Sequence, residues 1–121
     1  MTPELLRERF QKIAQTEVDF LSLRYVRTLS ENLEMRQNVL TPPIVSHDEG
    51  VMLMVHNTGG LGYAATSDLS DAGLSKAFKL ALNWANNSAA FALTDFSLIE
   101  MPANKGVYKG RVLLPWDKIA L

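Results

Sequence analysis

A short acidic stretch beside a histidine is the part of this sequence best suited to bind a metal ion. His47-Asp48-Glu49 supplies an imidazole and two carboxylates, and His56 follows shortly after. A zinc-peptidase helix carries His-Glu-x-x-His on one face, and that spacing is absent here. We expect a turn at Asp48-Glu49-Gly50, which would keep the two histidines from converging on one ion. A polar hairpin end is therefore favoured over a metal site or a hydrolase built on His47 and Asp48.

Three glycines in Gly59-Gly60-Leu61-Gly62 raise the possibility of a phosphate-binding loop. Such a loop leads from a strand directly into a helix N-terminus. Here the glycines lead into another predicted strand, Leu61–Ser67. The sequence therefore predicts a hairpin turn at Asn57–Gly60, where glycine permits a positive φ.

The hydroxyl side chains of Thr66, Ser67 and Ser70 lie near the carboxylate of Asp68 in the sequence. A hydroxyl nucleophile needs an oriented base beside it, and no histidine is near in the sequence. Helix capping by Ser70, with Asp68 serving the same turn, is the simpler interpretation.

Composition excludes several classes of function. The chain has 121 residues, 47% of them hydrophobic, with a net charge of −1 and no cysteine. Disulfides, cysteine metal ligands and thiolate catalysis are therefore excluded within it. Lysine and arginine are scattered, which disfavours a nucleic-acid partner. The N-terminus lacks the apolar core of a secretory signal, and the apolar runs are too short to span a membrane, so we expect a cytoplasmic protein without a membrane partner.

Two helices are predicted, at Thr2–Gln15 and Ser70–Asn87. Thr2 is placed to cap the first helix, and Pro3 suits its first position. Ser70 is placed to cap the second helix, and Leu69 and Leu74 occupy the positions of a hydrophobic staple. Each helix has an apolar stripe at helical spacing: Leu6, Phe10 and Ile13 in the first, and Leu74, Ala77, Phe78, Ala81, Leu82 and Ala85 in the second. From this pattern we expect Leu82→Asp to damage folding more than any surface change.

Between the helices, alternating apolar and polar residues predict about five strands joined by short, antiparallel links. The first two, Val18–Thr28 and Glu31–Gln37, are expected to form a hairpin through Leu29-Ser30-Glu31. Pro42 and Pro43 should delay the third strand. The remaining three predicted strands are Ile44–His47, Val51–His56 and Leu61–Ser67.

These elements give an α+β fold in the order helix, strands, helix, with both helices on one face of an antiparallel sheet. We expect a domain over residues 1–92 and an extended tail or linker over residues 93–121. Within the second part, Ser88–Thr94 could extend the helix, Phe96–Met101 is a short strand or extended tail, and Pro102–Gly106 is a linker. Val107–Leu121 is extended in pattern.

The run Gly62-Tyr63-Ala64-Ala65-Thr66-Ser67-Asp68-Leu69-Ser70, followed by Gly73-Leu74 and an alanine-rich helix, resembles the N-terminal domain of the TldD/PmbA family. Leu23-Arg24-Tyr25, the Leu33 and Met35 pair, and Gly50–Val55 resemble earlier family strands in the same order. The resemblance covers roughly residues 3–90. Two departures are Met54, where the family often has arginine, and Asn38–Pro43, where it usually has an Asn-Gly turn.

The resemblance implies a zinc metallopeptidase that acts on unfolded or extended peptides, from a family once described as modulators of DNA gyrase. The family's metal ligands lie in the C-terminal half, so we expect no catalytic, cofactor-binding or metal-ligating residue in this chain. Zinc would belong to a following C-terminal domain, and a TldD/PmbA-type subunit would be the homo- or heterodimeric partner. The chain alone is then expected to be inactive. The alternative is a stand-alone or metal-free partner module without peptidase activity.

Overall fold

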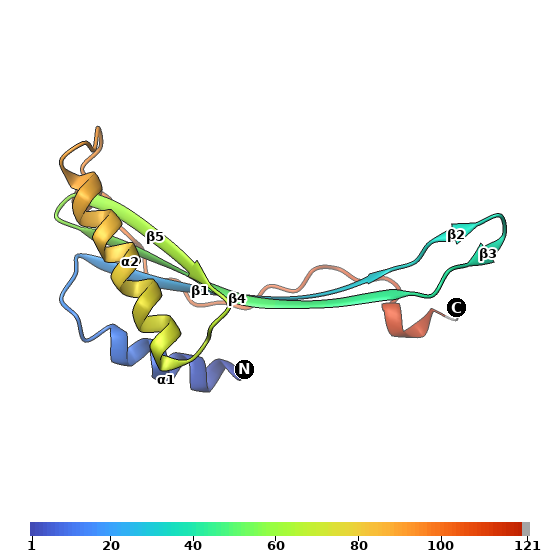
Figure 1. Ribbon diagram of the computed structural model, residues 1–121. Coiled ribbons are helices and arrows are strands. Elements are labelled where there is room, and N and C mark those ends of the chain that lie inside the picture. The colour runs from blue at the N-terminus through green and yellow to red at the C-terminus, as the bar shows by residue number, and fades with distance from the viewer. Residues whose placement is uncertain (120–121) are drawn as a thin grey trace.

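The computed structural model describes residues 1–119 and confirms an α+β fold (Figure 1). Three strands form an antiparallel sheet in the order β1-β4-β5, and β2 and β3 form a separate two-stranded sheet. The predicted order of helix, strands and helix is also confirmed. In chain order the elements are α1 (Pro3–Ile13), β1 (Phe20–Asn32), β2 (Met35–Arg36), β3 (Val39–Leu40), β4 (Ile44–Asn57), β5 (Gly60–Thr66), α2 (Asp71–Ala89), and the 3-10 helices η1 (Phe96–Leu98) and η2 (Trp116–Lys118).

The core lies between one face of the sheet and the two helices. Side chains alternate between faces along a strand, so every second residue of β4 points to the helices. Val51, Leu53 and Val55 are these residues, and all three are buried. Leu6 and Ile13 of α1 and five residues of α2 join the same cluster, which confirms that both helices cover one face. The opposite face of β4 carries Met52, which is 37% exposed.

Helix α2 lies unusually close to β5 because β5 is built from small residues. A Cβ added to Gly62 would stand 2.0 Å from the carbonyl oxygen of Ala81, and one added to Gly60 would stand 2.0 Å from that of Ala85. Ser88 strengthens this contact, since its Oγ donates to the Leu61 carbonyl oxygen at 2.9 Å. The glycines and alanines of this strand thus keep it slim enough for the helix to approach.

The buried side of α2 differs in one detail from the prediction. Leu74 is fully buried, and Phe78 and Ala81 are buried beside it. Leu82 is only partly buried, at the margin of the core. Leu74 is therefore expected to be more sensitive to substitution than Leu82, and the expected effect of Leu82→Asp stays a prediction.

The predicted hairpin at Leu29-Ser30-Glu31 and the predicted turn at Asp48-Glu49-Gly50 are both wrong. β1 continues through the first segment to Asn32, and β4 continues through the second from Ile44. The two strands pair without interruption from Phe20 opposite His56 to Asn32 opposite Ile44. The residues at these places are polar because this part of the β1–β4 pair is exposed to solvent on both faces.

The long ribbon turns back at its far end, between β2 and β3. Gln37 and Asn38 both have positive φ, 52° and 62°, as a type I′ hairpin turn requires. The predicted strand Glu31–Gln37 is thus replaced by the end of β1 and the short β2. Pro42 and Pro43 precede β4, which starts at Ile44, so the predicted late start is confirmed.

The segment after α2 is largely irregular. α2 ends at Ala89, so only part of the expected extension over Ser88–Thr94 exists. Phe96–Leu98 forms a 3-10 helix and not a strand. The predicted linker Pro102–Gly106 has no regular structure, and Trp116–Lys118 interrupts the expected extended stretch with a further 3-10 helix. Leu121, where that stretch was predicted to end, lies outside the described residues. Within residues 1–119, no helix has both the length and the apolar character to cross a membrane.

The contact between β5 and α2 can be tested by one added methyl group. Gly62→Ala should lower the free energy of unfolding by about 1–3 kcal/mol or more, because the new Cβ has no space against the backbone of α2. Urea unfolding followed by circular dichroism measures the change. Gly110→Ala is the matched control, since nothing lies within 4 Å of its added Cβ. Equal stability of the two variants would contradict this account of the contact.

Candidate functional site

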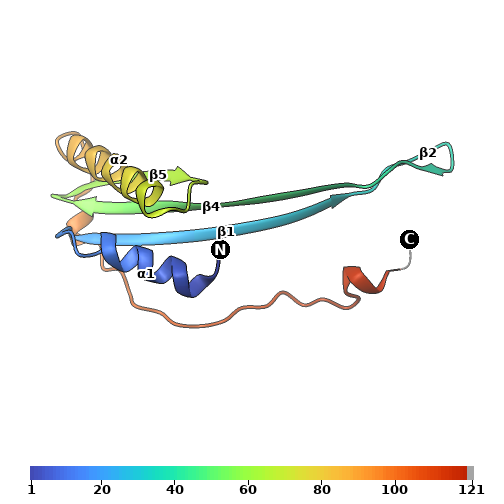
Figure 2. The same ribbon diagram turned by 60° about the horizontal axis from the view of Figure 1, so that its bottom comes forward.

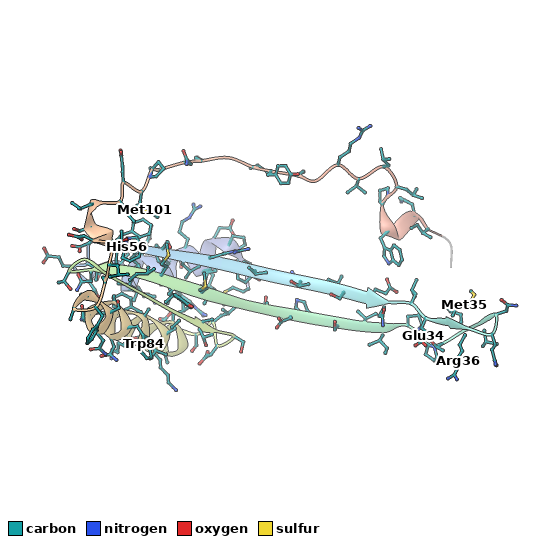
Figure 3. All side chains as sticks on the ribbon, turned by 90° about the horizontal axis from the view of Figure 1, so that it is seen from above. Glu34, Met35, Arg36, His56, Trp84 and Met101 are labelled. Atoms are coloured by element: carbon teal, nitrogen blue, oxygen red, sulfur yellow. The ribbon has the colours of Figure 1, made fainter. Side chains whose placement is uncertain are left out.

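The structure does not bring His47 and His56 together. Both lie in β4, roughly 30 Å apart at about 3.3 Å per residue. His56 is 4% exposed, with its ring 5.1 Å from that of Phe20 and 5.4 Å from that of Phe96 (Figure 3). His47 lies on the exposed ribbon and accepts a 2.9 Å hydrogen bond from Nε of Arg27. The described residues contain no group of three histidine or acidic side chains arranged to bind a metal.

His47 and Asp48 are also poorly placed for a shared catalytic role. They are neighbours in an extended strand, so their side chains point to opposite faces. Glu49 instead accepts a 2.7 Å hydrogen bond from the hydroxyl of Tyr25. This bond raises the pKa of Tyr25 and lowers the pKa of Glu49, because it favours the neutral phenol and the charged carboxylate.

The glycine-rich segment forms the predicted hairpin turn between β4 and β5. Thr58 and Gly59 have positive φ values of 51° and 81°, again as a type I′ turn requires. The chain continues into β5 at Gly60 and not into a helix. The interpretation as a turn is confirmed, and the geometry of a phosphate loop is absent from this part of the chain.

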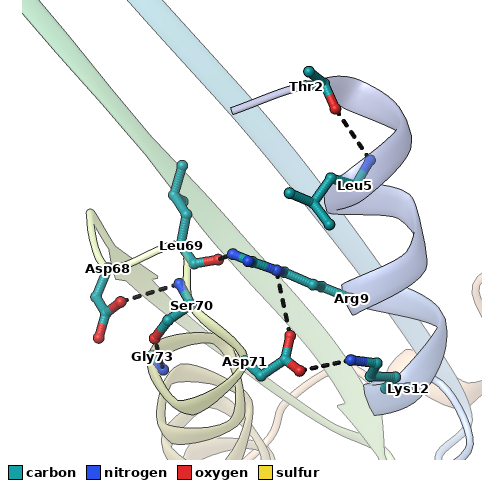
Figure 4. Close-up of polar contacts among 9 residues, drawn as sticks. All are labelled: Thr2, Leu5, Arg9, Lys12, Asp68, Leu69, Ser70, Asp71 and Gly73. Atoms are coloured by element: carbon teal, nitrogen blue, oxygen red, sulfur yellow. Dashed lines mark hydrogen bonds and ion pairs between the residues drawn. The ribbon is translucent and has the colours of Figure 1, made fainter.

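The hydroxyls and carboxylate after β5 form a chain of capping hydrogen bonds. The amide of Asp68 donates to Thr66 Oγ1, the amide of Ser70 donates to Asp68 Oδ1, and the amide of Gly73 donates to Ser70 Oγ, at 3.0, 3.0 and 3.1 Å. Hydrogen bonds from Ser70 lower the pKa of Asp68. The predicted capping role of Ser70 is confirmed, since its Oγ accepts a hydrogen bond from the amide of Gly73 in the first turn of α2 (Figure 4).

The same end of α2 is fastened to α1. Lys12 Nζ lies 2.6 Å from one carboxylate oxygen of Asp71, and Arg9 Nε lies 3.3 Å from the other. Arg9 also donates to the carbonyl oxygen of Leu69 (Figure 4). The hydrogen bond from Lys12 is the main reason that the pKa of Asp71 is lowered, and both cations favour the charged form. These contacts fix the second helix beside the end of β5.

An open hollow of about 590 Å³ lies where β5 ends and β1 and β4 continue. β5 pairs with β4 only from Val51 to Asn57, so one backbone edge of β4 has no partner from Ile44 to Gly50 among the described residues. The hollow opens beside this edge on the face away from the helices. Its lining includes apolar and charged side chains from both long strands: Val26, Met52, Arg24 and Asp48.

This hollow has the chemistry of a contact surface for an extended chain. An unpaired strand edge offers backbone donors and acceptors, and adjacent apolar side chains offer contact area. Sequence analysis missed it because the turn predicted at Asp48-Glu49-Gly50 divided β4 into two short strands. The difference between the seven residues of β5 and the fourteen of β4 creates it.

Comparison with known proteins relates this chain to a protein family. Residues 21–85 match the family model described as PmbA/TldA metallopeptidase domain 1, which is more than half of the chain. The chain belongs to the PmbA/TldD family. No curated protein and no solved structure matches it. The matched residues run from the start of β1 into α2 and include the Gly62–Ser70 run, so the resemblance on which the family was recognised is confirmed.

The ion pairs of Asp71 predict a dependence of stability on pH. The pKa of Asp71 is lowered from its ordinary value of 3.8, so its contribution is complete above that value and is lost as pH falls through the folded pKa. Asp71→Asn should therefore destabilise the domain at pH 7 and flatten the acid side of its stability curve. Unfolding free energies measured from pH 7 to pH 2 test this.

Asp117→Asn serves as the control for that experiment. Asp117 is an exposed aspartate of η2 whose charged neighbour, Lys118, lies 3.7 Å away. The pH dependence of the unfolding free energy of Asp117→Asn should follow that of the parent protein. An Asp71→Asn curve that also follows the parent would show that the link between the helices does not stabilise the fold.

Proposed function

We propose that this chain is the N-terminal, non-catalytic domain of a PmbA/TldD-type zinc metallopeptidase, where it supports assembly and forms one wall of the substrate cleft. The match of residues 21–85 to the first domain of that family carries the proposal. Residues of a following domain would hold the zinc ion. The proposed partner is a second PmbA/TldD-type subunit, and the proposed setting is the cytoplasm.

The hollow at the end of β5 supports a role in holding the substrate. A peptide in extended form would continue the line of β5 along the free edge of β4. Backbone pairing selects for an extended conformation more than for sequence, which suits unfolded chains. Side chains of the peptide would then lie against Met52 and Val26 in the hollow.

Charge introduced into the hollow should weaken peptide binding. Met52→Lys should raise the Kd of an unstructured peptide about tenfold, since loss of one buried apolar contact costs on the order of 1.5 kcal/mol. Leu80→Lys is the matched control because Leu80, 49% exposed, lies on the outer face of α2. Fluorescence anisotropy of a labelled peptide measures both. Equal affinities for the two variants would rule out the hollow as the peptide site.

The non-catalytic role is tested by measuring hydrolysis of a quenched unstructured peptide. With equimolar zinc, the chain alone should show no cleavage. A PmbA/TldD-type catalytic subunit should bind it and cleave the peptide, and a zinc chelator should abolish that cleavage. Chelator-sensitive cleavage by the chain alone would overturn the proposal. Binding of the subunit without any effect on cleavage would favour the alternative of a partner module.

A further inference from the structure

The outer edge of β1 is a long strand edge that has no backbone partner among the described residues. β1 lies at the margin of the sheet, and all thirteen of its residues pair with β4 in an unbroken register. Proteins usually blunt such an edge with lysine, proline or a bulge, because its free backbone groups pair readily with another chain. Phe20–Asn32 contains neither lysine nor proline. The edge is therefore suited to pairing.

The far part of β1 belongs to a two-stranded ribbon, residues 26–50, that projects from the body of the domain (Figures 1 and 2). No residue in it is buried. A two-stranded ribbon in water is marginally stable by itself, so further contacts are expected to support it. Its exposed large apolar side chains are Val26, Leu29, Met35, Val39, Leu40, Ile44 and Val45.

The charges on this edge are self-complementary. If two copies of β1 pair antiparallel about a two-fold axis at Leu29, Arg27 lies opposite Glu31 of the partner subunit, and Leu29 lies opposite Leu29 of the partner subunit. A symmetric interface needs this property, because the same strand must serve both sides. Opposite charges across neighbouring strands attract, and like charges repel.

The side chains involved point to one face. Arg27, Leu29 and Glu31 alternate with the other residues of β1 and share the face of Leu23 and Tyr25. The ion pairs and the leucine pair would therefore lie side by side. Leu29 is 73% exposed, so it has much surface to bury. Only Nε of Arg27 donates to His47, so the two terminal nitrogens of its guanidinium are available to donate to a partner.

We propose that a second copy of this chain pairs antiparallel with β1 through residues Val26–Asn32, which joins the three strands of each copy into one continuous sheet. This deepens the assembly role in the proposed function and rests on it. The partner edge is distinct from the β4 edge assigned to the peptide. Dimerisation and peptide binding can therefore fail separately.

One segment of the chain itself competes for this edge. The irregular segment between Met101 and Trp116 runs along the β1 side of the sheet (Figures 2 and 3), and the indole Nε1 of Trp116 donates to Glu31. No backbone hydrogen bond joins that segment to β1 among the described residues. The second copy is therefore expected to replace the Trp116 contact, and the test must separate the two occupants.

Charge exchange tests the register by analytical ultracentrifugation. Arg27→Glu and Glu31→Arg should each raise the dimer Kd at least about tenfold, since two attractive pairs become two repulsive ones. An equimolar mixture of the two variants should restore the parent affinity, because the copy with two acidic side chains then faces the copy with two basic ones. Restoration also shows that both variants fold. A monomeric parent protein at 100 µM, or no restoration in the mixture, would overturn the proposal.

Cysteine cross-linking locates the axis, because the chain has no cysteine of its own. Leu29→Cys should form a disulfide dimer under mild oxidation, since residues paired across a two-fold axis lie about 4.5–5.5 Å apart at Cα. Ala65→Cys, at an exposed position of β5, is the control and should cross-link at least about tenfold more slowly. Equal rates would overturn the proposed axis. Slow exchange of the outer β1 amides in a monomer would assign the edge to the chain's own tail instead.

Discussion

The backbone of β5 lies directly against the backbone of α2, and the rest of the domain is arranged around that contact. Gly60 and Gly62 have no side chain, so the helix approaches to a distance that a single Cβ would prevent. Ala81 and Ala85 present the matching small surface. This close approach places the apolar stripe of α2 over the centre of β4, where the fully buried core residues meet.

The residues after β5 determine where this strand ends and where α2 begins. Asp68 and Ser70 satisfy the amides at the start of α2, and Asp71 fastens that end of the helix to α1. The turn into the helix ends β5 at Thr66, whereas its neighbour β4 and the next strand β1 continue. The hollow and the free edge of β4 are thus consequences of where the helix begins. The capping residues of α2, which the sequence predicted, thus position the hollow beside β4, which it did not predict.

The sequence predicted those features that depend on interactions between residues close together in the chain. Capping residues, the apolar stripe of α2 and the Thr58-Gly59 turn were all recognisable from the sequence. The long ribbon was not, because Asp48-Glu49-Gly50 has the composition of a turn, and only pairing with distant residues of β1 makes it a strand. The alternation that normally marks a strand reflects burial of one face. A ribbon exposed on both faces lacks that constraint, so polar residues there carry no information about a turn.

The sequence run that resembles the family has a structural role in this chain. Within Gly62–Ser70, glycine gives the close helix contact, and the oxygens of Thr66, Asp68 and Ser70 accept hydrogen bonds from the backbone. Oxygens occupied in this way are poorly placed to activate a substrate. The run fixes a shape, which is a sheet with one short strand and two long ones. Family membership therefore transfers an architecture to this chain, and the oxygens of the run serve that architecture.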